Sequence, residues 1–272
     1  MKIHPTSVVS PDVEIGPDVE IGPYCLIQGK GKIGRGTFVE GHVTLGYKHG
    51  VILIGENNHF SPGAVIGGPP QDVSYKGEET TLVVGNNNTF REFSTVNLPT
   101  SKAEKKTIIG NNCYIMAYAH VGHDCKLGNN VIMANNTGLA GHCEIEDNVV
   151  ISAMCGLSQF TRVGRGAFIG GGSVINKDIP PFVRAEGHWA VVRATNKIGL
   201  IRRGSSREEV NNIHKAVRIM VMGKGTIDEN IERIRTECKM SENLEHFIHF
   251  IKSSKKGIAI SRGQGPKEVS DE

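Results

Sequence analysis

Three histidines and one aspartate lie close together in the sequence near the middle of the chain, at His120, His123, Asp124 and His142. A neutral imidazole has an unperturbed pKa close to neutrality, so it is well suited to removing a proton from a weak nucleophile such as a hydroxyl group. A lone histidine at a turn is usually solvated or satisfied by its neighbours. Several histidines gathered with a carboxylate instead indicate a mutual hydrogen-bonding network or a shared substrate. The cluster therefore predicts acid–base chemistry if the fold brings these side chains together.

The elements that would position this cluster follow from a six-residue repeat of aliphatic side chains. The fourth residue after each aliphatic one is small or β-branched, and both positions are expected to point inward. Short strands joined by tight turns, with three faces per coil, predict a triangular prism of about 18 residues per coil. Residues one coil apart then stack, so one column holds His123, Gly141 and Gln159, and the next holds Asp124 and His142. The aliphatic positions are Val9, Ile15, Ile21, Ile27, Ile33, Val39 and Leu45, and then Ile109, Ile115, Val121, Leu127, Met133, Leu139, Ile145, Ile151, Leu157, Val163, Ile169 and Ile175.

Composition and charge exclude several classes of protein. Glycine makes up 34 of the 272 residues, and the turns of such a prism account for this excess, because Gly enters turn conformations that strain other residues. No apolar run is long enough to span a membrane and the first residues lack a signal-peptide pattern, so we expect a cytoplasmic protein. A net charge of +3 is too small to indicate nucleic-acid binding. Five of the six cysteines fall at the small inward position and no CxxC pair occurs, which favours packing residues over metal ligands or disulfides.

The six-residue period stops after the pair Pro180-Pro181, and signals of α-helix follow. Apolar residues there recur at helical spacing behind residues that can cap helices, which predicts a three-helix appendage. The expected caps are Ser205 or Ser206, Thr226 and Ser241. We expect a prism domain at residues 1–187, a helical domain at residues 188–260 and a loose tail at residues 261–272.

Five short motifs are more specific than the repeat. They are Gly68-Pro69-Pro70-Gln71-Asp72, Ala119-His120-Val121-Gly122-His123-Asp124-Cys125, Leu139-Ala140-Gly141-His142, Ser158-Gln159-Phe160 and Ile201-Arg202-Arg203-Gly204. The repeat alone resembles the β-helix of hexapeptide-repeat acyltransferases, which are homotrimers with active sites between neighbouring prisms. With these motifs and the helical end, the chain resembles the family of UDP-N-acetylglucosamine O-acyltransferases, which begin lipid A biosynthesis. The fold class implied by this resemblance is an all-β left-handed parallel β-helix followed by a small α-helical C-terminal domain.

The resemblance implies a reaction as well as a fold. A 3-hydroxyacyl chain would pass from acyl carrier protein to the 3-position of UDP-N-acetylglucosamine or its 3-amino analogue. Acyl carrier protein and a UDP-sugar are thus the expected partners of a homotrimer. The carrier-protein thioester is itself a substrate, so neither a cofactor nor a metal ion is expected. Such a transfer needs a general base for the weakly nucleophilic acceptor and hydrogen-bond donors for the oxyanion.

The family pattern assigns roles to individual residues of this chain. It makes His123 the general base and the backbone N–H of Gly141 the oxyanion donor. Gly171 matches the position that sets acyl-chain length, where a bulky side chain would shorten the accepted chain, although Gly at this position could equally be a plain turn residue of the prism. Asn196 and Arg202 match the end that holds the uridine diphosphate, for which an arginine can form charge-assisted hydrogen bonds. The other expected substrate-binding residues are Asp72, Ser74, His120, Asp124, His142 and Gln159.

Two positions depart from the family pattern. Ser74 stands where many members have lysine, and Asn97 stands where many have histidine. Both positions lie near the sugar pocket in the family. The loss of two neighbours that can carry positive charge favours an acceptor with an amine at the 3-position, which would give an amide instead of an ester.

Two other functions are compatible with a β-helix. A γ-class carbonic anhydrase is a β-helix trimer that binds zinc through three histidines. Its paired ligands have the spacing His-x4-His, whereas the pair in this chain is His120-x2-His123. A non-catalytic β-helix scaffold needs no polar cluster on stacked coils. Metal analysis would detect the zinc enzyme, and loss of acyl transfer in His123→Ala with an intact trimer would exclude the scaffold.

Overall fold

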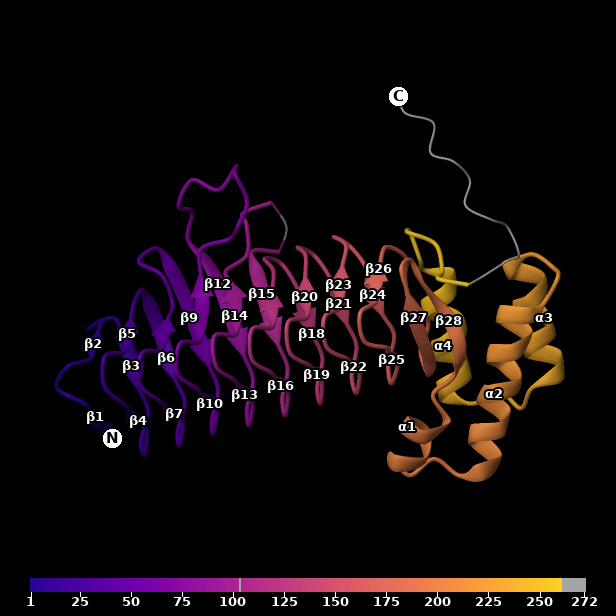
Figure 1. Ribbon diagram of the computed structural model, residues 1–272, viewed down its shortest axis with the longest axis horizontal. Coiled ribbons are helices and arrows are strands. Elements are labelled where there is room, and N and C mark those ends of the chain that lie inside the picture. Colours follow the sequence, from indigo (N-terminus) through magenta and orange to yellow (C-terminus); the bar gives the residue numbers. More distant parts are fainter. Residues whose placement is uncertain (103, 261–272) are drawn as a thin grey trace.

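The prism predicted from the repeat is the main body of the molecule. A computed structural model describes residues 1–102 and 104–260, and Figure 1 shows the strands stacked along one long axis, with the helices gathered at one end. Every third strand along the chain joins the same sheet, and neighbouring strands of the prism pair in parallel. His120 pairs with Gly138, a step of 18 residues, which is the coil length that the repeat predicts.

Within the described residues, the three faces of the prism are sheets of 11, 9 and 8 strands, which we name sheets A, B and C. Sheet A contains β1 (Lys2–Ile3), β4 (Glu20–Ile21), β7 (Phe38–Val39), β10 (His59–Phe60), β13 (Thr89–Phe90), β16 (Tyr114–Ile115), β19 (Ile132–Met133), β22 (Val150–Ile151), β25 (Phe168–Ile169), β27 (Val183–Gly187) and β28 (Ala190–Thr195). Sheet B contains β2 (Val8–Val9), β5 (Leu26–Ile27), β8 (Thr44–Leu45), β11 (Val65–Gly68), β14 (Thr95–Asn97), β17 (His120–Val121), β20 (Gly138–Leu139), β23 (Gly156–Leu157) and β26 (Val174–Ile175). Sheet C contains β3 (Val13–Ile15), β6 (Lys30–Ile33), β9 (Gly50–Ile54), β12 (Thr80–Val84), β15 (Lys106–Ile109), β18 (Lys126–Leu127), β21 (Glu144–Ile145) and β24 (Arg162–Val163).

The inward-facing side chains fill the prism. Successive residues of a strand point to opposite faces, so in β17 Val121 is fully buried while His120 faces outward and is half-buried. The predicted aliphatic positions are buried except for Val9 and Ile15 near the first coil, which are only half-buried. The five cysteines at the small inward position are buried as well, in agreement with a packing role.

Two loops interrupt the stack between sheet B and sheet C. The first, residues 69–79, follows β11, and the second, residues 98–102 with 104 and 105, follows β14; both lie beside β12 and β15 in Figure 1. Leu98 anchors the second loop, because its side chain is fully buried against Gly50, where a Cβ would overlap it. The hydroxyl of Ser101 donates to Glu78 Oε1 and links the two loops. Both loops therefore place their side chains at the edge where sheets B and C meet.

The chain after the prism forms a hairpin and four described helices. Strands β27 and β28 pair antiparallel at the end of sheet A. The three predicted helices are present as α2 (Arg207–Met222), α3 (Ile227–Glu237) and α4 (Glu242–Lys252), and the short helix α1 (Lys197–Arg202) precedes them. Ser206 caps α2 and Thr226 forms a capping box on α3, whereas the Ser241 side chain makes no capping hydrogen bond on α4. The sequence did not predict α1, because this helix has only six residues and one of them is Gly199, which is unfavourable inside a helix.

Residues 253–260 return from α4 to the prism. The hydroxyl of Ser254 donates to Asp178 Oδ2 at 2.7 Å, and Asp178 forms a parallel bridge with Ile258. The division predicted at residue 187 falls inside the β27–β28 hairpin and stays a prediction. The tail predicted for residues 261–272 lies outside the described residues. No described helix is both long and apolar enough to cross a membrane.

Candidate active site

The predicted histidine cluster lies in the turns that join sheet B to sheet C. His123 and Asp124 follow β17, and Gly141 and His142 follow β20 one coil later. The backbone N–H of His142 donates to the carbonyl oxygen of His123, so the two turns are stacked as the repeat predicts. Asp124 and His142 have φ of 60° and 63°, in the left-handed region. We call the turns 123–124, 141–142 and 159–160 the histidine corner.

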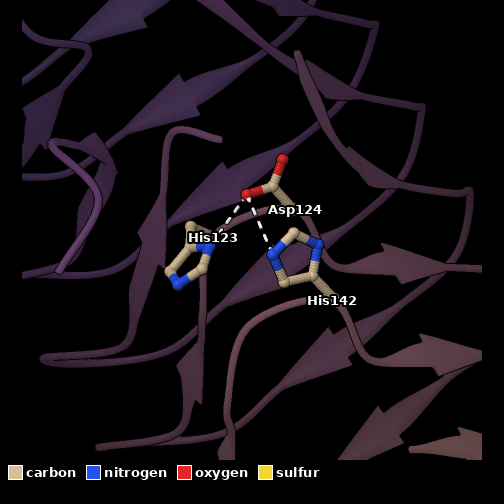
Figure 2. Close-up of side chains that lie close together, drawn as sticks. All are labelled: His123, Asp124 and His142. Atoms are coloured by element: carbon tan, nitrogen blue, oxygen red, sulfur yellow. Dashed lines mark hydrogen bonds and ion pairs between the residues drawn. The ribbon is translucent and has the colours of Figure 1, made fainter. Parts of the chain in front are cut away.

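His123 and Asp124 form a buried pair. His123 Nδ1 lies 2.8 Å from Asp124 Oδ2, and only 8% of the His123 side chain and 2% of the Asp124 side chain are exposed (Figure 2). Burial raises the pKa of Asp124, but the hydrogen bonds from His123 and Thr100 outweigh it and hold that pKa below its ordinary value. Because the carboxylate is ionised, His123 Nδ1 donates its hydrogen to it, and Nε2 is the unprotonated nitrogen of the neutral ring. This arrangement is suited to a general base.

His142 completes the cluster from the next coil. Its Nε2 lies 3.8 Å from Asp124 Oδ2, and its ring meets the His123 ring edge-on with the centroids 5.2 Å apart. The opposite side of His142 stacks on Phe160, with centroids 4.6 Å apart. Burial lowers the pKa of His142, and the nearby carboxylate of Asp124 only partly counteracts this effect. His142 is therefore neutral at physiological pH and can donate or accept a hydrogen bond.

Gly141 leaves room for the imidazole of His123. A Cβ at position 141 would lie 2.6 Å from His123 Nε2 and closer still to Cε1, so any larger residue would displace the ring. The N–H of Gly141 makes no hydrogen bond to another residue in the described part of the chain. The glycine thus has a packing role that the sequence did not predict, and its N–H is free for a ligand.

His120 lies beside the corner, on the outward face of β17. Its Nδ1 is 2.7 Å from the hydroxyl of Thr95 on the neighbouring strand β14. Burial, together with nearby His123, lowers the pKa of His120. Thr95 was not among the predicted site residues, and only its place opposite His120 in the sheet brings it to the site.

Asp72 and Ser74 lie on the first loop. The N–H and hydroxyl of Ser74 donate to Asp72 Oδ1 at 2.8 and 2.6 Å, and Lys102 Nζ lies 3.1 Å from Asp72 Oδ2. These donors hold the pKa of Asp72 well below its ordinary value. The charges of Asp72 on the first loop and Lys102 on the second both contribute to the pKa of His142. The sequence predicted no role for Lys102, which supplies a cation beside a position where the family often has lysine.

The remaining predicted residues lie on other parts of the prism. Asn196 and Arg202 line a cavity of about 590 Å³ on sheet A, whose floor is formed by Ile132, Val150 and Phe168. The Asn196 side chain is used in the fold, because it accepts from the N–H of Gly199 to cap α1 and donates to the carbonyl of Gly166. Its capping role was not predicted.

Gln159 and Gly171 lie on different edges of the prism. Gln159 is in the histidine corner, where its carbonyl oxygen accepts a hydrogen bond from Lys256 Nζ. Gly171 follows β25 and precedes β26, so it lies at the edge between sheets A and B. A Cβ at Gly171 would make only ordinary contacts, the nearest at 3.5 Å from the Ala153 carbonyl oxygen. Within one chain, the histidine corner thus lies between sheets B and C, the cavity on sheet A, and Gly171 at the edge between sheets A and B.

Two family models match parts of the chain. One described as "Udp N-acetylglucosamine O-acyltransferase; Domain 2" matches residues 178–259, and one for the bacterial transferase hexapeptide, six repeats, matches residues 106–141. A Thermodesulfovibrio yellowstonii protein named acyl-[acyl-carrier-protein]–UDP-N-acetylglucosamine O-acyltransferase is 43% identical over 94% of this chain and 98% of its own length. This chain belongs to the UDP-N-acetylglucosamine O-acyltransferase family.

A second sequence relative and two solved structures agree with this family and with the fold. A Rhizobium johnstonii protein with the same name as the Thermodesulfovibrio relative is 37% identical over 98% of this chain and 97% of its own. The structure of the Francisella novicida UDP-N-acetylglucosamine acyltransferase has a TM-score of 0.91 and 37% identity, and covers 96% of this chain and 95% of that chain. The Campylobacter jejuni enzyme has a TM-score of 0.89 and 38% identity over 96% and 100% of the two chains. The predicted left-handed parallel β-helix with a small helical end, and the predicted enzyme class of acyltransferase, are confirmed.

The same cluster has the chemistry of a metal site. One ligand atom each from His123, Asp124 and His142 lie within 4.8 Å of one another. Two imidazoles and a carboxylate with an open fourth position are a common ligand set of catalytic zinc. Here, however, His123 Nδ1 is already hydrogen-bonded to Asp124, so a metal bound through that nitrogen would have to replace this bond. Metal analysis of the purified protein tests this alternative directly.

Proposed function

We propose that this chain transfers a 3-hydroxyacyl group from the thioester of acyl carrier protein to the 3-position of UDP-N-acetylglucosamine, the first step of lipid A biosynthesis. The relatives that cover most of the chain carry the name of this activity. The observation that carries the proposal is the buried His123–Asp124 pair, which packs against Gly141, a residue whose backbone N–H makes no hydrogen bond to another described residue. Because the thioester already activates the acyl group, the proposal needs no cofactor. We also propose that the enzyme acts in the cytoplasm.

His123 acts as the general base of this reaction. Its Nε2 accepts the proton of the acceptor group while that group attacks the thioester carbonyl carbon. Asp124 holds the ring through Nδ1 and stabilises the imidazolium that forms. A positioned base of this kind contributes about 10²- to 10⁴-fold in rate.

The tetrahedral intermediate carries its negative charge on the former carbonyl oxygen. Gly141 packs against the His123 ring, and in this proposal its backbone N–H donates a hydrogen bond to the oxyanion. When the intermediate collapses, the carbon–sulfur bond breaks, and the departing thiolate of the carrier arm takes the proton from His123. The products are the acylated sugar nucleotide and the free carrier thiol, and His123 is neutral again.

The complete site is shared between copies of the chain in a homotrimer. The proposal is supported by the placement of predicted residues on different edges of one prism: His123 between sheets B and C, Arg202 over sheet A, and Gly171 between sheets A and B. The edge near Gly171 also exposes stacked aromatic rings, such as Phe93 on Tyr118, which are half-exposed and suited to packing on a second copy.

Mixed trimers test whether the site is shared. We would co-express His123→Ala and Arg202→Ala chains, each of which alone gives a weakened enzyme. In mixed trimers, the Arg202→Ala chain supplies His123 and the His123→Ala chain supplies Arg202 to the same interface, so activity rises above that of either pure trimer. If mixing restores no activity, both residues serve a site within one chain.

The acceptor atom depends on two positions that differ from the family pattern. The structure weakens the argument from Ser74, because Lys102 supplies a cation to Asp72. Asn97 still supports the amine acceptor. Its side chain is buried, and its Oδ1 has no hydrogen-bond partner in the described part of the chain. Asn97 therefore favours the amine acceptor, and the hypothesis rests on this residue alone.

One assay tests both the activity and the acceptor. Purified protein is given 3-hydroxyacyl carrier protein with UDP-N-acetylglucosamine or its 3-amino analogue, and the release of carrier thiol and the acylated sugar are measured. Transfer to either sugar, abolished in His123→Ala, supports the proposed activity, and no transfer to either sugar contradicts it. Faster transfer to the amine supports the role of Asn97, and equal or faster transfer to the hydroxyl sugar contradicts it.

A further inference from the structure

The second loop contacts the catalytic pair through Thr100. The N–H and the hydroxyl of Thr100 donate to Asp124 Oδ2 at 3.0 and 2.9 Å, the same oxygen that accepts from His123 Nδ1. Thr100 is fully buried, and the family motifs in the sequence did not include it. One carboxylate oxygen therefore receives three hydrogen bonds, two of them from a single residue.

Two further contacts lie on either side of Thr100 in the chain. Leu98 is buried against Gly50 before Thr100, and after it Thr107 Oγ1 accepts a hydrogen bond from the backbone N–H of Asp124 at 3.0 Å. Asp124 is thus held through its carboxylate by Thr100 in the loop and through its backbone by Thr107 in β15. A rigid anchor of this kind fixes the position of the carboxylate more closely than a mobile surface loop would.

The hydrogen bonds of Thr100 act on the orientation of the carboxylate. Asp124 is buried, and its other oxygen, Oδ1, has no hydrogen-bond partner in the described part of the chain. Without Thr100, the carboxylate could turn and present Oδ1 to His123 or to the adjacent ring of His142. The ring of His123, which is held through Nδ1, would then lose its fixed orientation, and Nε2 would no longer point at the proton that it accepts from the acceptor group.

We propose that Thr100 is a positioning residue, which fixes the carboxylate of Asp124 and through it the direction of the His123 ring. The inference rests on the proposed function, because it assigns Thr100 a part in acyl transfer. It also explains why the chain departs from the six-residue repeat here: the loop carries a donor that no regular turn of the prism would place at this oxygen. The loop is then part of the active site and not merely an insertion.

A pair of variants separates the hydroxyl from the shape of the side chain. Thr100→Val keeps the branched shape and removes the hydroxyl donor, whereas Thr100→Ser keeps the donor and removes a methyl group. We expect kcat to fall about tenfold in Thr100→Val, the rate equivalent of about 1.4 kcal/mol, and to stay near the wild-type value in Thr100→Ser. KM for the UDP-sugar should be unchanged in both variants, because Thr100 is not expected to touch the substrate.

A double-mutant cycle shows whether Thr100 acts through Asp124. In Asp124→Asn protein, adding Thr100→Val should cause little further loss of kcat, because the carboxylate that Thr100 positions is already gone. A tenfold loss in both backgrounds, or a Thr100→Val enzyme as active as the wild type, would overturn the inference. Should Thr100→Val not give folded trimer, Thr100→Ala removes the same donor without adding an apolar group and gives the same readings.

The wild-type enzyme separates this inference from the proposed function. If it transfers no acyl group, the proposed function fails before Thr100 is tested. If it transfers the acyl group and the Thr100 variants behave like it, the proposed function stands and only the positioning role fails.

Discussion

Two edges of the prism have the same backbone but different side-chain chemistry. The asparagine corner, where sheet C meets sheet A, consists of the turns 86–87, 111–112, 129–130 and 147–148. Its second residues, such as Asn112 and Asn130, have φ of 55°, close to the 60° and 63° of Asp124 and His142 in the histidine corner. The first residues of the turns also correspond, with Asn111 and Asn129 at the place that His123 occupies in its own corner.

The asparagine corner uses its polar groups to hold the coils together. Asn111 Oδ1 accepts the backbone N–H of Asn86 at 2.8 Å, Asn129 Oδ1 accepts that of Asn111 at 2.9 Å, and Asp147 Oδ1 accepts that of Asn129 at 2.6 Å. Each turn thus satisfies the donor of the coil before it. Such a ladder stabilises the stack and leaves these groups unavailable to a substrate.

The histidine corner leaves its equivalent groups open. Gly141 has no side chain that could accept a hydrogen bond from the backbone N–H of His123, and its own N–H makes no hydrogen bond to another residue in the described part of the chain. Asp124 Oδ1 also has no partner among the described residues. The repeat thus decides where turn residues stack, while the choice between asparagine and histidine or glycine decides whether the polar groups of a corner are used between coils or left open.

The largest expected effect is a difference in kcat between variants of the two corners. We expect His123→Ala to lower kcat by about 10³-fold, because the general base is lost. Transfer of the acyl group is measured at fixed pH, and the oligomeric state and the melting temperature of the variant are checked against the wild type. Asn111→Ala, at the same turn position of the asparagine corner, is the matched control and should keep full activity. Wild-type activity in His123→Ala would remove His123 as the base.

Gly141→Ala tests whether the open space in the histidine corner is required. A Cβ there would overlap the imidazole of His123, so we expect the ring to move and kcat to fall by about 10²-fold. Gly138→Ala is the control on the same coil, because a Cβ at Gly138 would meet nothing within 4 Å. Equal activity of the two variants would show that the His123 ring can move aside without cost.

Unlike the variants of the histidine corner, Asn129→Ala should lose stability and keep its activity. Removing the Asn129 side chain leaves the backbone N–H of Asn111 without its acceptor, which costs about 1 to 2 kcal/mol in the free energy of unfolding. Denaturant unfolding at a fixed protein concentration measures this loss. A decrease in kcat of more than about threefold, which corresponds to more than about 0.7 kcal/mol in activation free energy, would contradict the separation of the two corners.

The stacking of the turns in the histidine corner was predicted from the sequence, because the six-residue repeat determines which turns lie above one another. The columns of His123 with Gly141 and of Asp124 with His142 follow directly from a coil of 18 residues, since turns that recur at one interval must stack. The helices α2 to α4 were predicted for a similar reason, because their caps and apolar faces are local features.

The rest could not be predicted, because it depends on the loops that leave the repeat. Thr100 and Lys102 come to the site from a loop whose path no period describes, and their contacts depend on the packing of Leu98 against Gly50. Asn196 matched a family position, but its use as a cap of α1 requires the three-dimensional position of a short helix. The roles proposed for the site residues stay predictions until the variants are measured.

The smallest expected effect concerns the pH dependence of stability. Burial lowers the pKa of both His120 and His142, so at a pH below about 6.5 the unfolded chain binds protons at these positions before the folded chain does. The stabilisation from neutral His120 and His142 is complete above that pH and is lost as the pH falls through their lowered pKa values. Unfolding at pH 7.5 and pH 5.5 should therefore show a decrease in stability that is smaller in His142→Gln. Asn129→Ala keeps both histidines and should therefore show the same pH dependence as the wild type. An equal pH dependence in His142→Gln and the wild type would show that His142 is as easily protonated in the folded chain as in the unfolded one.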